Sequence, residues 1–163
     1  MLSIRKKIDE SSLLNDLIKI NDGRIISYEQ ALNNSGNLDS DIIQLLNRII
    51  ENSKINIVEL TDKLIKLNGK STVSISGILF RAWMDLKAGL AGNSRSSVIN
   101  FCLYNEEMAL HTYNAAMNLS GTIDEEIKAI ISHQQGALRQ IYELIKGYKE
   151  TRYSSNSRLV YFN

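Results

Sequence analysis

The stretch from residue 123 to residue 150, IDEEIKAIISHQQGALRQIYELIKGYKE, decides the fold of this chain. Apolar side chains recur along it in alternating steps of three and four residues, which is the spacing of one face of an α-helix. Thr122 and Glu125 have the spacing of a capping box, whose side chains bond the free backbone N–H groups at a helix start. The sequence therefore predicts one long amphipathic helix. Its core face comprises Ile127, Ile130, Gln134, Ala137, Ile141, Leu144 and Tyr148, flanked by Ile131, Leu138 and Ile145.

The same helical periodicity appears in three other long segments and one short segment. The chain contains no proline, the residue that most strongly interrupts helices. Clusters of Gly, Asn and Ser, which end one helix and cap the next, occur at 33–40, 68–71, 91–94 and 120–122. The first long helix is expected to end at about residue 32, the second to run over about 39–68 and the third over about 94–119. The short helix is expected over about 73–90.

Helices that each have one apolar face can bury those faces together only as a bundle. Short loops make two hairpins of the long helices, and the short helix at 73–90 stands between the hairpins. This order matches the ferritin-like form of the four-helix bundle better than the simple up-down-up-down form. We predict an all-α fold, a ferritin-like four-helix bundle over residues 1–150 with a short crossover helix. Residues 151–163 form a C-terminal tail that is either frayed or docked on the bundle or on a partner.

Length and charge exclude several classes of protein. The 163 residues suit one domain, and 19 basic against 18 acidic residues give a net charge of +1. A dedicated nucleic-acid or anionic-membrane binder would carry a strong positive charge. The lone cysteine, Cys102, permits no intrachain disulfide and suits a reducing compartment. With no signal-peptide pattern and no apolar run of about 18 residues, we expect a cytoplasmic protein that binds neither nucleic acid nor membrane.

The common catalytic motifs are missing from the sequence. It contains no G-x-S-x-G elbow to present a nucleophilic serine. It also contains neither of the glycine-rich patterns that cradle phosphate groups. These features favour a protein that is not an enzyme.

Residues 74–117 carry the sequence SISGILFRAWMDLKAGLAGNSRSSVINFCLYNEEMALHTYNAAM, which includes R-x-W-M-D-L-K-A at 81–88 and the acidic pair Glu106 and Glu107. With these features the chain resembles a bacterial family of ferritin-like four-helix-bundle domains of unknown function. The resemblance covers roughly residues 10–150. It implies a ferritin-like fold and, by analogy with many ferritin-like proteins, a role in stress physiology.

A ferritin-like fold raises the question of a di-metal centre, which takes Glu from two helices and Glu-x-x-His from the other two. No Glu of this sequence is followed by His at the third position. The resemblance implies a Glu near the position of Ile26 and a His near that of Tyr142, and neither residue present is an equivalent ligand. Glu59 and Glu106 remain at acidic positions similar to the family's. Two carboxylates do not complete such a site, so we expect no cofactor and treat these two as candidate remnants of a metal centre.

One polar residue interrupts the apolar face near the middle of each long helix, namely Asn21, Ser53, Glu106 and Gln134. Because mid-helix positions meet at similar heights in antiparallel hairpins, we expect a polar layer in the core. This layer is either the remnant of a metal or small-ligand pocket, or a hydrogen-bonded layer that fixes helix register. We favour the second interpretation, with Glu106 bonded to Gln134 or Asn21.

Two classes of function follow from the sequence. The favoured one is a non-catalytic helical bundle that acts through its surface or through self-association, with a second copy or an unidentified protein as its partner. The alternative is a metal-binding or oxidative protein with a degenerate di-metal site in the bundle centre.

Overall fold

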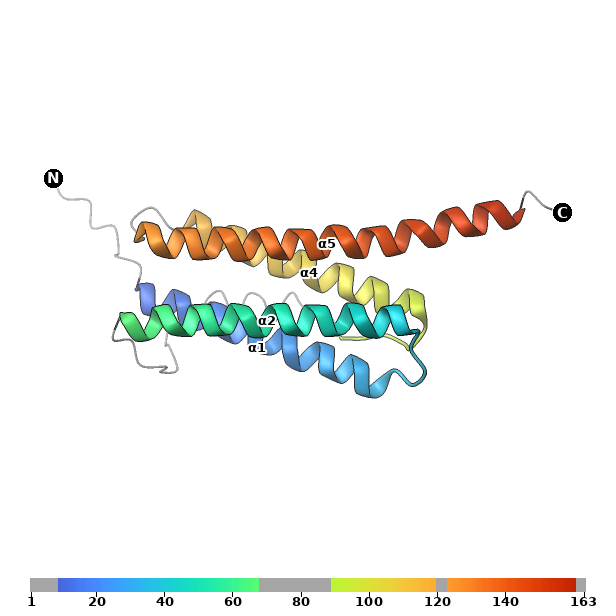
Figure 1. Ribbon diagram of the computed structural model, residues 1–163, viewed down its shortest axis with the longest axis horizontal. Coiled ribbons are helices and arrows are strands. Elements are labelled where there is room, and N and C mark those ends of the chain that lie inside the picture. The colour runs from blue at the N-terminus through green and yellow to red at the C-terminus, as the bar shows by residue number, and fades with distance from the viewer. Residues whose placement is uncertain (1–8, 68–88, 120–122, 161–163) are drawn as a thin grey trace.

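The computed structural model describes residues 9–67, 89–119 and 123–160, with the side chains from residue 151 onward left out. In these ranges the chain forms four helices and no strand, so the predicted all-α four-helix fold is confirmed (Figure 1). The helix predicted at 73–90 lies outside the described residues except for its last two, which are not helical, and Thr122 also lies outside them. The helices are α1 (Glu10–Asn34), α2 (Ser40–Lys66), α4 (Arg95–Asn118) and α5 (Glu125–Val160).

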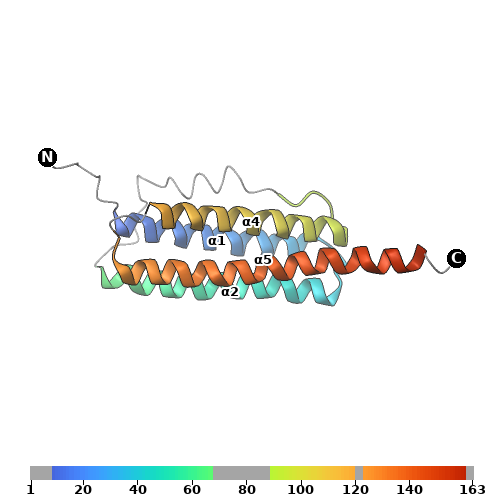
Figure 2. The same cartoon turned by 90° about the horizontal axis from the view of Figure 1, so that it is seen from above.

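The helices are arranged as two antiparallel hairpins, α1 with α2 and α4 with α5 (Figure 1). Since α2 and α4 run in the same direction, the end of α2 and the start of α4 lie at opposite ends of the bundle. Contacts between the hairpins join α2 to α5 and α1 to α4. Figure 2 shows α1 and α4 along one side of the bundle and α2 and α5 along the other.

The helix ends follow the breaks in the sequence, with one exception. After α1, Gly36 has a φ of 64°, a left-handed conformation that glycine adopts without steric cost and that ends the helix. Before α4, the side chain of Ser94 caps the helix by accepting a hydrogen bond from the backbone N–H of Ser97. The exception is α5, which continues to Val160 instead of ending at residue 150. The segment 151–160 contains neither Gly nor Pro to stop it.

Two apolar clusters fill the bundle, one toward each end, and all four helices contribute to both. The first cluster includes Leu14, Leu17 and Ile20 of α1, Leu60 of α2, Leu110 of α4 and Leu138 of α5. The second includes Ala31 of α1, Ile42 and Ile49 of α2, Cys102 of α4 and Ile145 of α5. Between the clusters lies the middle of each helix.

The core face of α1 agrees with the sequence pattern in part. Steps of three and four residues predict a face that includes Asn21, Ile25 and Tyr28, and Asn21 and Tyr28 are indeed buried, whereas Ile25 is only partly buried and Arg24 is 1% exposed. The buried face is thus rotated from the predicted one by about half of the 100° that separates successive residues. The reason for the difference is electrostatic. The Arg24 guanidinium pairs with the Glu106 carboxylate in the bundle centre, and an apolar side chain in place of Arg24 would leave that carboxylate buried without a partner.

The rotation of α1 can be tested with two isoleucines of that helix. Ile20 is fully buried and Ile26 is 47% exposed. Ile20→Ala should lower the free energy of unfolding by about 2 to 5 kcal/mol through lost burial and a residual cavity. Ile26→Ala should change it by less than about 0.5 kcal/mol. Urea denaturation of both variants measures the difference, and equal losses would contradict the orientation of α1.

Ion pairs connect the two hairpins near both ends of the bundle. At the start of α4, Arg95 lies 2.9 Å from the Asp39 carboxylate and 2.6 Å from that of Asp41. Near the end of α2, Lys63 Nζ lies 2.7 Å from the carboxylate of Glu126 and 3.2 Å from that of Asp124. These contacts tie α2 to the first residues of α4 and of α5.

The Arg95 contact makes the stability depend on pH. Hydrogen bonds from Arg95 lower the pKa of Asp41 below its usual range. A carboxyl group with a lowered pKa stabilises the fold above its unfolded pKa, about 3.9, and this contribution is lost as the pH falls through the folded pKa. Asp41→Asn and Arg95→Gln should therefore both lose less stability than the wild type below about pH 4. Chemical denaturation at several pH values measures this, and a wild-type acid response in Asp41→Asn would contradict it.

Candidate functional site

Polar side chains from all four helices meet in the bundle centre, between the two apolar clusters. The four residues of the expected polar layer are all buried here, with Asn21, Ser53 and Glu106 at 0% exposure and Gln134 at 1%. Four further polar side chains lie in the same layer. These are Arg24 and Tyr28, each 1% exposed, Tyr113, which is 0% exposed, and Asn56, which is 3% exposed.

A buried ion pair between α1 and α4 forms the middle of this layer. Arg24 Nη2 lies 2.7 Å from Glu106 Oε2, and Arg24 Nε donates to Glu106 Oε1 at 3.1 Å. The Tyr28 hydroxyl donates to the same Oε1 at 2.8 Å. Two parallel bonds from a guanidinium to a carboxylate are among the strongest hydrogen bonds in proteins.

Glu106 is therefore held differently from the sequence expectation. Its hydrogen-bond donors are a guanidinium and a phenol, and not the amides of Gln134 or Asn21. The physical reason is charge. An amide can satisfy one lone pair of a carboxylate, but a guanidinium also neutralises it, which matters most where water is excluded.

A chain of hydrogen bonds continues from this ion pair across the bundle. Arg24 Nη1 donates to Asn21 Oδ1 at 3.0 Å, and Asn21 Nδ2 donates to the Tyr113 hydroxyl at 2.8 Å. The Tyr113 hydroxyl donates to Gln134 Oε1 at 2.8 Å, and Gln134 Nε2 donates to Glu59 Oε2 at 2.9 Å. In this order the chain passes through α1, α4, α5 and α2.

Ser53 is buried beside this chain but takes no part in it. Its hydroxyl donates to the backbone oxygen of Ile49 at 2.9 Å, within its own helix. This is a common bond for a serine inside a helix, and it leaves the hydroxyl proton unable to reach a neighbouring helix. Asn56 instead connects α2 to the network, since its Nδ2 donates to Asn21 Oδ1 at 3.1 Å and its backbone oxygen accepts from Gln134 at 3.3 Å.

The two candidate remnants of a metal centre lie in one network but are not bonded to each other. Glu59 is only partly buried, whereas Glu106 is fully buried against Arg24. Ile26, where the family resemblance implied a Glu, is 47% exposed and faces away from the centre. In residues 9–67, 89–119 and 123–150, no group of three or more His, Cys, Asp and Glu side chains is placed to hold a metal ion.

Arg24, Tyr28, Tyr113 and the Cys102 thiol keep their protons at neutral pH, because their pKa values are raised. Burial alone would lower the pKa of Arg24, but the charge and hydrogen bonds of Glu106 outweigh burial and leave this pKa raised. Burial raises the pKa of Tyr113 to about 12. Burial and the nearby Glu106 charge raise the pKa of Tyr28 well above its usual value and also raise that of the Cys102 thiol. None of these groups is therefore a ready base or nucleophile at neutral pH.

The sequence interpretation missed Arg24 and Tyr28 as members of the site. A signal for them exists, because Asn21, Arg24 and Tyr28 follow one another in steps of three and four residues and so share a helix face. Because arginine is rarely buried, the sequence alone favours the neighbouring Ile25 for the core.

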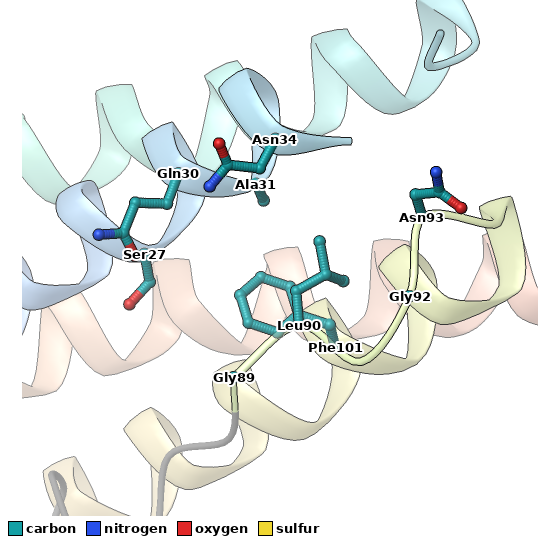
Figure 3. Close-up of a pocket in the computed structure, with 9 residues that line it drawn as sticks. All are labelled: Ser27, Gln30, Ala31, Asn34, Gly89, Leu90, Gly92, Asn93 and Phe101. Carbon is teal, nitrogen blue, oxygen red and sulfur yellow. The ribbon is translucent and has the colours of Figure 1, made fainter. Parts of the chain in front are cut away.

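A surface pocket of about 500 Å³ lies away from the centre, between the end of α1 and the segment that leads into α4 (Figure 3). Ala31, Leu90 and Phe101 give it an apolar floor, and hydroxyl and amide side chains surround them. Its described lining residues carry no charge. The polar ones are Ser27, Gln30, Asn34 and Asn93.

A family model described as a domain of unknown function, DUF2383, matches residues 9–119, which is more than half of the chain. The chain belongs to the DUF2383 family. The expected membership in a family of unknown function is thus confirmed. The DUF2383 match takes in α1, α2 and α4, including Arg24 and Glu106, and ends before α5, which supplies Gln134.

Among curated proteins, none matches this chain. No helix in the described part of the DUF2383 chain has both the length and the apolar composition needed to cross a membrane.

The buried ion pair can be tested with a double-mutant cycle. Arg24→Met and Glu106→Leu should each lower the free energy of unfolding by about 3 to 5 kcal/mol, because each leaves one buried charge without its partner. The double variant contains neither charge, so it should lose far less than the sum of the two single losses. Urea denaturation of the four proteins measures the coupling.

An exposed ion pair of α5 provides the control for this cycle. Lys146 Nζ lies 3.7 Å from the Glu143 carboxylate, and the two side chains are 42% and 61% exposed. The corresponding cycle of Lys146→Met and Glu143→Leu should give a coupling below about 1 kcal/mol. Additive losses for the Arg24 and Glu106 variants would show that the two side chains do not form the pair.

Proposed function

We propose that this chain is a non-catalytic helical bundle of the ferritin-like type, which acts by binding a protein partner or a second copy of itself. The observation that carries the proposal is the Arg24–Glu106 ion pair. The carboxylate at the bundle centre receives two bonds from a guanidinium, at 2.7 and 3.1 Å, and one from a phenol. Its charge is neutralised within the protein, so the centre requires no external cation.

The remaining chemistry of the centre supports the same function. A catalytic acid or base needs a pKa near the working pH and access to a substrate. Tyr28 and Tyr113 have raised pKa values and are 1% and 0% exposed. Both hydroxyl groups are already donors within the network. These residues suit a structural role, in which they position the helices.

The ferritin-like part of the proposal rests on helix direction. A bundle in which the second and third long helices run the same way needs a long connection between its hairpins, as in ferritin-like folds. A role in stress physiology would follow from this fold analogy and from no particular residue of the chain.

A metal-binding or oxidative protein with a degenerate di-metal site is the alternative. It is favoured by Glu59, a partly buried carboxylate that the hydrogen-bonded chain links to Glu106. For a metal ion to bind Glu106, however, the Arg24 guanidinium would have to give up two hydrogen bonds and remain buried. That rearrangement would cost much of the affinity of such a site.

Thermal melting with and without metal separates these functions. Wild type, Glu106→Gln and the surface control Glu51→Gln are each melted with chelator and with added Fe²⁺ or Mn²⁺. Glu106→Gln should melt at a lower temperature than the wild type, because it leaves the Arg24 charge unpaired. We expect metal to shift none of the three melts specifically. An upward shift in the wild type and in Glu51→Gln that Glu106→Gln lacks would overturn the proposal and establish a metal site.

A further inference from the structure

Helix α2 carries a second apolar surface, on the side opposite its core face. Ile55, Val58 and Ile65 are 64%, 62% and 64% exposed, which makes them the most exposed large hydrophobic residues in the described part of the chain. With a rotation of about 100° per residue, they lie roughly opposite core residues such as Leu60. We call Ile55, Val58, Asp62 and Ile65 the outer face of α2.

This surface has the pattern of a helix-packing seam. A helix that packs only in its own bundle has a polar outer side. On the outer face of α2, the steps between successive residues are three, four and three, as in the seam where one helix packs against another. Among the described helices the neighbours of α2 are α1 and α5, and both views place α2 at an outer corner of these four helices (Figures 1 and 2). The pattern therefore suits a helix other than these four.

We propose that the outer face of α2 packs against the same face of a second copy of this chain, with the two helices antiparallel and Val58 at the two-fold axis. This inference rests on the self-association part of the proposed function. The argument for a second copy is charge complementarity. Lys54 and Asp62 stand four residues before and after Val58, so the axis brings Lys54 of each copy level with Asp62 of the other. A parallel pairing would instead set Asp62 against Asp62.

Apolar contacts support the same pairing. Val58 of one copy meets Val58 of the other at the axis. Ile65 of each copy lies about one helical turn beyond Lys54 of the other, where it can cover the methylene stem of that lysine. Lys54 also lies 3.2 Å from Glu51 of its own helix, but at 52% exposure its side chain remains accessible. The pairing thus covers Val58 and Ile65 and gives Asp62 a charged partner.

Cysteine crosslinking tests the position of the axis. The native Cys102 is fully buried, so an added surface cysteine is the accessible thiol among the described residues. Val58→Cys should form a disulfide-linked dimer under mild oxidation, because the two positions meet at the axis. Ile65→Cys is the matched control, since its two copies would be about 21 Å apart and should not crosslink. Crosslinking of both variants, or of neither, would overturn the antiparallel pairing.

Charge reversal tests the two cross-copy ion pairs. Lys54→Asp and Asp62→Lys each place like charges opposite one another twice, so each should raise the dimer dissociation constant roughly tenfold. The double variant Lys54→Asp/Asp62→Lys exchanges the charges and should return to within about threefold of the wild type. Sedimentation equilibrium measures these constants. A double variant as weak as the single ones would overturn the pairing.

Sedimentation of the wild type separates failure of this surface from failure of self-association. We expect a monomer–dimer equilibrium. If the wild type dimerises and the α2 variants have the same dissociation constant, the proposed α2 surface is wrong, whereas the proposal of self-association still holds. A wild type that stays monomeric at every concentration would overturn both. The non-catalytic assignment is tested separately, by the response of the melts to metal.

Discussion

The Arg24–Glu106 ion pair is the constraint on which the arrangement of the helices depends. A charge at 1% or 0% exposure is costly unless its partner is in place, and this pair spans two helices from different hairpins. A slip or rotation of α1 against α4 by one residue would separate the charges inside the core. The pair therefore selects one height and one rotation of α1, including the orientation that leaves Ile25 at the edge of the core.

The polar layer also explains why the core consists of two apolar clusters instead of one continuous cluster. Apolar packing alone tolerates sliding of helices, because isoleucine and leucine side chains repeat along each face. The buried polar contacts, and the ion pairs of Arg95 and Lys63 near the ends, connect one hairpin to the other. Apolar burial thus drives the hairpins together, and the charged contacts determine how they fit.

The helices could be predicted from the sequence because they depend on local periodicity and on local breaks such as Gly36 and Ser94. The core face of α5 could be predicted only in part, since Ile131, Leu138 and Ile145, expected at its flank, are fully buried, whereas Ile130, Ala137 and Leu144 are only partly buried. The four predicted polar positions are all buried, since each interrupts an otherwise apolar face, and three of them, Asn21, Glu106 and Gln134, share the hydrogen-bond network. Periodicity places Arg24 on the helix face of Asn21 and Tyr28, but it does not show the ion pair, because the partner Glu106 is 82 residues away in the sequence. Nor does periodicity decide between Ser53 and Asn56, since only the rotation of α2 in the bundle determines which side chain reaches a neighbouring helix.

The hydrogen bonds of the central chain all point the same way, from Arg24 through Asn21, Tyr113 and Gln134 to Glu59. A guanidinium can only donate and a carboxylate oxygen only accepts, so the two ends leave the amides and the hydroxyl between them a single orientation. The backbone oxygens of Leu17 and Asn56, which also accept from Asn21 Nδ2 and Gln134 Nε2, favour the same orientation. The direction of the chain is therefore fixed at both ends and along its length, so its amides and its phenol keep little orientational entropy.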